Sequence, residues 1–129
     1  YNESTFAEGG HNIKQDGQTV FKNAVKNMAD AAEQVLIQHD LSGDDIAYLL
    51  PHQANKRIID ATARRINLSE DRVLMNIEKY GNTTAATLPL LISDFESKFS
   101  KGDKLIFAAF GGGFTWGAVY LTWNYDYKN

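Results

Sequence analysis

Three short polar segments contain the residues whose types could do chemistry. His52 begins the segment 52–55 (HQAN), Asn82 lies in the segment 80–83 (YGNT), and three glycines occupy 111–113. Near pH 7, imidazole and carboxamide groups are uncharged hydrogen-bond donors, and backbone N–H groups in a glycine-rich turn can form an anion-binding concavity. This combination indicates a site that stabilises negative charge on a carbonyl oxygen, in preference to a metal-dependent hydrolytic site.

Each segment also has a purely structural interpretation. A histidine after a strand is often a hydrogen-bonded structural residue. Asn82 could be the N-cap of a following helix, and the glycine run could be only a tight turn between paired strands. The glycine run is not a dinucleotide-binding fingerprint, because it precedes a strand and does not open a helix.

The elements that must position these segments follow from the spacing of apolar residues. The predicted helices span 18–39, 54–66 and about 83–99, and the predicted strands span 46–50, 73–77, 104–110 and 115–123. The polar residues 1–17 are expected to form an irregular lead-in. The order α-β-α-β-α-β-β predicts an α/β fold with a mixed sheet, mostly parallel with a terminal antiparallel pair. Loops after parallel strands emerge at one edge, so we expect the three polar segments to converge there.

The segment 83–93 (TTAATLPLLIS) has no charged residue on any face of its predicted helix. A helix of this kind is normally covered on both sides, whereas an α/β unit of this size can cover only one. We therefore expect the other face to lie in a dimer interface or against a further layer of a larger protein.

Composition limits the possible classes of protein. The chain has 129 residues, 43% apolar and 22% charged, with a formal net charge of −3 and no cysteine. These values indicate one soluble domain, and they exclude a disulfide scaffold, a thiolate nucleophile and a cysteine-ligated zinc site within the sequence. No apolar run is long enough to span a bilayer, and the acidic balance argues against broad nucleic-acid binding. Without a signal peptide we expect a cytoplasmic protein, and the start at Tyr1 rather than Met indicates a processed or excised piece.

Basic residues concentrate within this acidic chain, at Lys56, Arg57, Arg64, Arg65 and Arg72. Arg57 and Arg64 are seven residues apart and therefore share one helix face. The cluster is either a solvated face with an i,i+4 ion pair from Lys56 to an aspartate at position 60, or a docking patch for an acidic or phosphate-bearing partner.

Three motifs in order resemble one enzyme family. PHQANKRII at 51–59, YGNTTAATLP at 80–89 and FGGGFTWGA at 110–118 resemble the C-terminal half of β-ketoacyl-acyl-carrier-protein synthase III, a thiolase-fold condensing enzyme. The resemblance runs from about Gly17 to Trp123 and covers less than half of the family's full length. It implies that residues 18–129 are half of a thiolase-like fold, which in the complete enzyme has five αβαβα layers.

The resemblance implies a decarboxylative Claisen condensation that initiates fatty-acid synthesis. A family member moves an acyl group from acyl-CoA to a cysteine and condenses it with malonyl-acyl carrier protein, releasing CO2. His52 and Asn82 match the pair that hydrogen-bonds the malonyl thioester carbonyl, and Gly112 matches a backbone donor of the oxyanion hole. Asn55 and Phe110 match residues that line the pocket. The matches to the patch for carrier protein or CoA are Lys22, Arg57, Arg64 and Arg65.

The family's nucleophilic cysteine belongs to its N-terminal half, which this sequence lacks. The resemblance therefore implies an isolated C-terminal domain that cannot form the acyl-enzyme alone, with the N-terminal half, acyl carrier protein and acyl-CoA as partners and a homodimeric complete enzyme. It implies no cofactor, metal, nucleic acid or membrane. Two alternatives stay open: a related acyltransferase to a non-malonyl acceptor, and a non-catalytic carrier-protein-binding module.

Overall fold

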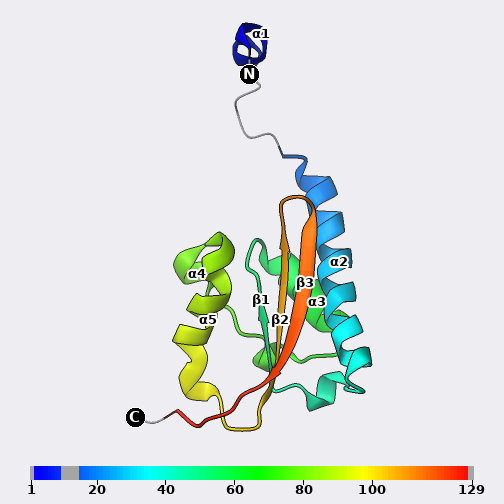
Figure 1. Ribbon diagram of the computed structural model, residues 1–129, viewed down its shortest axis with the longest axis vertical. Helices are drawn as coiled ribbons and strands as arrows, with labels where there is room; N and C mark the ends of the chain where they lie inside the picture. The colour runs from blue at the N-terminus through cyan, green and yellow to red at the C-terminus, as the bar shows by residue number, and fades with distance from the viewer. Residues whose placement is uncertain (1, 10–14, 128–129) are drawn as a thin grey trace.

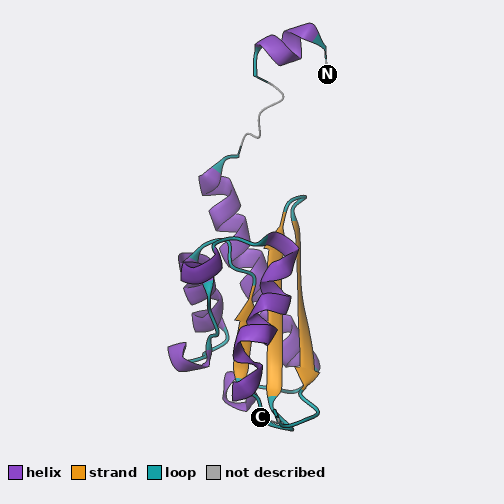
Figure 2. Cartoon of the chain, turned by 90° about the vertical axis from the view of Figure 1, so that its left-hand side faces the viewer, coloured by secondary structure: helices purple, strands orange, loops and turns teal. Residues whose placement is uncertain are grey.

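A computed structural model describes residues 2–9 and 15–127. Within these residues a sheet with the strand order β1-β2-β3 lies between helices on both of its faces (Figures 1 and 2). The strands are β1 (Tyr48–Pro51), β2 (Lys104–Gly111) and β3 (Thr115–Thr122). The helices are α1 (Glu3–Ala7), α2 (Gly17–Gln38), α3 (Lys56–Arg65), α4 (Ile77–Tyr80) and α5 (Thr87–Phe95). Short 3-10 turns span Gly43–Asp45 (η1), Glu70–Arg72 (η2), Thr84–Ala86 (η3) and Glu96–Lys98 (η4).

The sheet is mixed, as the sequence predicts. β1 runs parallel to β2, with Leu49 opposite Ile106, and β2 runs antiparallel to β3, with Phe107 opposite Val119. The β1–β2 connection is therefore a long crossover that includes α3 and α5, whereas residues 112–114 form a tight hairpin between β2 and β3. This topology brings the end of β1, the end of β2 and the hairpin to one edge (Figure 1).

Each face of the sheet has its own apolar core. On one face, α2 and α3 pack against alternate sheet residues that include Ile106 and Ala108. The buried stripe of α2 contains Ala24, Met28, Ala32 and Leu36. The segment of α3, with its C-cap, buries Ile58, Ile59, Ala63 and Ile66. On the other face, the fully buried Leu91 of α5 joins Leu50, Leu105 and Phe107. The strands thus separate two clusters, as their alternating side chains require.

The predicted strand at 73–77 is wrong, because this segment makes only an isolated parallel bridge between Val73 and Leu49. The Leu74 N–H still donates to the Leu49 carbonyl at 3.0 Å, but the next ladder position is lost. There, the N–H of Asn76 donates to the side chain of Gln53 instead of to a neighbouring strand. Helix α4 then begins at Ile77, so a long-range side-chain contact overrides the local strand preference.

The chain start differs from the expected irregular lead-in, whereas the charge-free segment is covered on one side, as expected within the chain. The lead-in contains the short helix α1, while residues 10–14 of it lie outside the described residues. Around α5, the inward side is buried at Leu91, whereas Ala85, Ala86 and Pro89 are exposed. One side of this charge-free segment is therefore uncovered within the chain, and its covering by another layer stays a prediction. Among the described residues, no helix has the length and apolarity needed to cross a membrane.

Candidate active site

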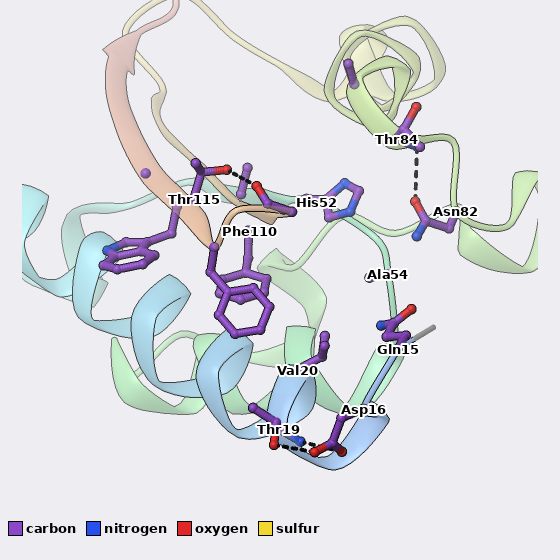
Figure 3. Close-up of a pocket in the computed structure, with 17 residues that line it drawn as sticks. Gln15, Asp16, Thr19, Val20, His52, Ala54, Asn82, Thr84, Phe110 and Thr115 are labelled. Carbon is purple, nitrogen blue, oxygen red and sulfur yellow. Dashed lines mark hydrogen bonds between the residues drawn. The ribbon is translucent and has the colours of Figure 1, made fainter. Parts of the chain in front are cut away.

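A cavity of about 790 Å³ lies at the edge where β1 and β2 end (Figure 3). Its walls come from the start of α2, the segment after β1, the segment before α5 and the β2–β3 hairpin. His52, Asn82, Phe110 and Gly112 all line it. The predicted convergence of the three polar segments is therefore confirmed.

His52 directly follows β1, and its N–H donates to the Ala108 carbonyl of β2 at 2.7 Å. This bond extends the parallel ladder by one position and fixes the point at which the histidine leaves the sheet. The side chain is partly buried. Burial lowers the pKa of His52 below its ordinary value near 6.5, and a hydrogen bond to the backbone of Thr84 acts more weakly in the opposite direction. The imidazole is therefore uncharged at neutral pH and carries one N–H donor.

Asn82 is not the N-cap of the element that follows it, because Thr83 has that position at the η3 turn. The Asn82 Oδ1 accepts a hydrogen bond from the Thr84 N–H at 3.0 Å, at the start of the short η3 turn. The amide nitrogen lies on the side away from Thr84 and makes no hydrogen bond within the described residues (Figure 3). This local bond uses the carboxamide oxygen and leaves the N–H₂ group of Asn82 as the end available to a ligand.

Thr84 lies between these two side chains in an unusual conformation. Its φ of 52° is in the left-handed region, which is costly for a β-branched residue. The other described non-glycine residues with positive φ are Asp40 and Asn67, which are types that tolerate it. Strained backbone of this kind concentrates at functional sites. The Thr84 backbone is hydrogen-bonded to both His52 and Asn82, so it relates the two donors to each other.

The β2–β3 hairpin supplies the remaining wall. The Thr115 hydroxyl donates to the Gly112 carbonyl at 3.0 Å, which holds the orientation of that peptide group. Gly113 has a φ of 138°, a conformation that favours glycine. Phe110 and Phe114 flank the glycines with ring centroids 5.1 Å apart. The glycine run is therefore a tight turn between paired strands and a wall of the cavity at the same time.

Asn55 does not lie where the resemblance places it. It is the N-cap of α3, where its Oδ1 accepts from the Arg57 N–H at 2.9 Å. It lines a second cavity, of about 390 Å³, together with Phe21, Lys22 and Arg57. It is absent from the walls of the larger cavity. The chain turns between positions 52 and 55, just before α3. The two ends of the segment 52–55 therefore face different cavities.

The expected basic patch separates into two parts. The Arg57 guanidinium lies 4.8 Å above the Phe21 ring, and Lys22 lines the same small cavity. Arg65 is engaged elsewhere: its Nη2 is 2.8 Å from the Glu33 carboxylate and 3.2 Å from that of Asp30. Its pKa is raised mainly by the Glu33 hydrogen bond.

Arg64 is exposed on α3, seven residues after Arg57. The i,i+4 ion pair between Lys56 and Asp60 is also present, at 3.0 Å. Lys22, Arg57 and Arg64 are therefore available to a partner, whereas Arg65 joins α3 to α2.

The sequence analysis missed several residues of the site. Asp16 and Thr19 reach the larger cavity from the first turn of α2, where Asp16 caps the helix through the Gln18 and Thr19 N–H groups. The hydrogen bond from the Thr19 hydroxyl, followed by these backbone bonds, lowers the pKa of Asp16. An aspartate four positions before the apolar stripe is a helix-start signal, and only the path of α2 brings it to the cavity. No group of three or more metal-ligating side chains occurs among residues 2–9 and 15–127.

Comparisons with known proteins agree with this geometry. A family model described as the C-terminal part of 3-oxoacyl-[acyl-carrier-protein] synthase III matches residues 36–123. A β-ketoacyl-[acyl-carrier-protein] synthase III of Azobacteroides pseudotrichonymphae is 55% identical over 116 residues, covering 90% of this chain and 35% of the relative. Synthase III 2 of Bacteroides thetaiotaomicron is 57% identical over 118 residues, covering 92% and 35%. This chain thus spans about a third of the length of these relatives.

Solved structures show the same fold. The crystal structure of 3-oxoacyl-(acyl carrier protein) synthase III from Pseudomonas aeruginosa PAO1 matches with a TM-score of 0.83 and 37% identity, covering 89% of this chain and 37% of the other. The synthase III of Aquifex aeolicus VF5 matches with a TM-score of 0.83 and 40% identity, covering 86% and 37%. The expected half of a thiolase-like fold is therefore confirmed.

Proposed function

This chain belongs to the family of 3-oxoacyl-acyl-carrier-protein synthase III C-terminal domains, and we propose that it forms the charge-stabilising half of such an enzyme's active site. The observation that carries the proposal is the meeting of His52, Asn82 and the 111–113 hairpin in one cavity. The proposed reaction is the condensation of an acyl group, taken from acyl-CoA, with malonyl-acyl carrier protein.

His52 and Asn82 act on the malonyl thioester. When the malonyl carboxylate leaves as CO2, the electron pair of the broken C–C bond moves into the thioester and forms an enolate, with its negative charge on the former carbonyl oxygen. An N–H of the neutral His52 imidazole and an N–H of the Asn82 amide donate to that oxygen. Donors held in place before the reaction stabilise the developing charge, and each contributes about 3 kcal/mol to lowering the barrier.

The enolate carbon then attacks the acyl group held as a thioester on a cysteine. The new C–C bond forms, the tetrahedral oxyanion collapses, and the cysteine leaves as a thiolate. The backbone N–H of Gly112 is proposed to donate to that oxyanion, next to Phe110 in the cavity wall. The sequence contains no cysteine, so the nucleophile is proposed to come from an N-terminal half that also covers the exposed side of the segment before α5.

The small cavity is the proposed contact site for acyl carrier protein and CoA. Lys22 and Arg57 present two cations beside it, and Arg64 continues the same face of α3. Cations in this arrangement suit the phosphates of CoA and of the carrier's prosthetic group, or an acidic carrier-protein surface. Asn55 adds a polar side chain to the same wall. We propose acyl carrier protein and acyl-CoA as partners of a cytoplasmic, homodimeric complete enzyme.

Mass spectrometry of the reaction products tests the proposal. The complete enzyme that carries this chain is mixed with acyl-CoA and malonyl-acyl carrier protein, and we expect 3-oxoacyl-carrier protein and CO2. This chain alone should not become acylated. Acylation and condensation by the chain alone would overturn the division of roles. Transfer of the acyl group to a hydroxyl or amine without loss of CO2 would overturn the condensing activity itself.

A further inference from the structure

A short chain of buried amides lies behind the cavity and joins its two donor segments. Gln53, only 1% exposed, accepts a hydrogen bond from the Asn76 N–H at 2.9 Å through its Oε1. Its Nε2 donates to Asn76 Oδ1 at 2.5 Å. Asn76, 5% exposed, donates from its Nδ2 to Asp94 Oδ2 at 2.9 Å. The Tyr80 hydroxyl donates to the other Asp94 oxygen at 3.2 Å. We call Gln53 and Asn76 the buried amide chain, which ends at the partly exposed carboxylate of Asp94.

The direction of every bond in the buried amide chain is determined by its two ends. At one end, a backbone N–H can only donate, so it must face Gln53 Oε1. At the other end, the hydrogen bond from Asn76 lowers the pKa of Asp94, which is therefore a carboxylate and can only accept. Turning over either amide would place two acceptors or two donors against each other. The pair is thus held in one orientation.

These bonds connect the two segments that carry the proposed donors. Gln53 immediately follows His52 at the end of β1, and Asn76 immediately precedes α4, which leads to Asn82. Asp94 adds an anchor on α5. The bond from the Asn76 N–H to Gln53 also ends the strand pairing after Leu74 and so directs the chain into α4.

We propose that Gln53 and Asn76 are positioning residues that set the placement of Asn82 relative to His52. Two buried amides stabilise a fold little better than a well-packed apolar pair, because each must be desolvated, but their bonds restrict the geometry far more. A displacement of about 1 Å in a catalytic group can reduce a rate by about 100-fold. The inference rests on the proposed function, because it assigns these residues a purpose in the same reaction.

A reversal of polarity tests the proposal. In the complete enzyme, Gln53→Glu places a carboxylate oxygen against Asn76 Oδ1, so that two acceptors face each other. If the Asn76 amide turned over to avoid this, its Oδ1 would instead face the carboxylate of Asp94. Adding Asp94→Asn removes the conflict between Asn76 Oδ1 and Asp94. The carboxylate at position 53 can then accept from the backbone N–H and the turned Nδ2 of Asn76, and Asn76 Oδ1 accepts from the amide at position 94. Asp60→Asn, which neutralises an aspartate paired with Lys56 on the surface of α3, is the matched control.

We expect Gln53→Glu to lower kcat for malonyl-carrier-protein decarboxylation by 10- to 100-fold, as about 1 Å of displacement would, with KM changed much less. Adding Asp94→Asn should raise kcat above that of the Gln53→Glu single variant and toward the wild-type value, whereas adding Asp60→Asn should leave it at the value of the single variant. Gln53→Met keeps the volume and should fold, yet it should lower kcat in the same way. Full activity of a folded Gln53→Met variant, or equal kcat of the Gln53→Glu single and the double variants, would overturn the inference.

A second measurement separates this inference from the proposed function. In wild type, NMR should detect slowed hydrogen exchange of the Gln53 and Asn76 side-chain amides, whether or not the enzyme decarboxylates malonyl-carrier protein. An inactive wild type with protected amides would contradict the proposed function alone. Unprotected amides would contradict the buried amide chain, even in an active enzyme.

Discussion

The Oδ1 of Asn82 holds the N–H of Thr84, two residues later, at 3.0 Å, and this bond decides which end of the carboxamide a ligand can reach. The structural and the chemical interpretations of Asn82 therefore apply to different atoms of one side chain. The oxygen accepts a backbone N–H of the turn before α5, and the nitrogen remains as a donor at the cavity. A substitution that changes only the nitrogen can separate the two roles.

Asn82→Asp makes that separation. The carboxylate still accepts from the Thr84 N–H, so the turn should form and the unfolding temperature should stay near that of wild type. The lost N–H donor and the added negative charge should reduce kcat for decarboxylation by at least 100-fold, in line with about 3 kcal/mol for one donor. Asn67→Asp, at an exposed position away from the cavity, should leave kcat unchanged. Wild-type kcat in Asn82→Asp would leave Asn82 with the structural role alone.

The protonation of His52 should make stability depend on pH in a defined direction. Burial lowers its pKa in the folded chain, while the unfolded chain titrates near 6.5. Between these two values the unfolded state binds more protons, so the free energy of unfolding rises with pH there and falls as pH drops below 6.5. Denaturant unfolding across this range measures the effect. His52→Gln keeps an N–H donor but does not titrate, so it should remove this contribution; an unchanged pH dependence would contradict the assignment.

Two adjacent glycines should respond differently to alanine. At Gly112 an added Cβ would meet no atom within 4 Å, so Gly112→Ala should keep the fold and, because its N–H remains, most of kcat. At Gly113 the φ of 138° and a Cβ placed 2.9 Å from Thr115 Cγ2 should destabilise the hairpin by about 1–3 kcal/mol. Thermal unfolding of the two variants measures the difference. Equal unfolding temperatures would show that the hairpin adopts another conformation.

Charge-reversal variants should distinguish Arg57, which is available to a partner, from Arg65, which is ion-paired within the chain. Arg57→Glu should weaken binding of the carrier protein or of CoA and reduce the salt dependence of that binding, because it replaces a cation at the small cavity. Arg65→Glu should instead lower the unfolding temperature, since it opposes Glu33 and Asp30 across α2 and α3. Titrations at two salt concentrations, with thermal unfolding, test both. Affinity that Arg57→Glu leaves unchanged would exclude the small cavity as the docking surface.

Local patterns predict the elements that depend on near neighbours. The apolar stripe after Asp16 predicts α2, and the apolar run before Gly111 predicts β2, because helix and strand periodicity depend on residues a few positions apart. The strand expected at 73–77 fails for the opposite reason. The N–H of Asn76 in this segment donates to the side chain of Gln53, which lies 23 residues earlier, and no local pattern predicts that contact.

The sequence by itself determined which chemical groups the site contains: an imidazole, a carboxamide and a glycine hairpin. Only the tertiary structure decided how those groups point and what holds them. It turned Asn55 to a second cavity, joined Arg65 to Glu33 and used the oxygen of Asn82 on Thr84. The physical reason is range, because element type follows from neighbours along the chain, whereas Arg65 and Gln53 depend on partners 32 and 23 residues away that only folding brings within hydrogen-bond distance.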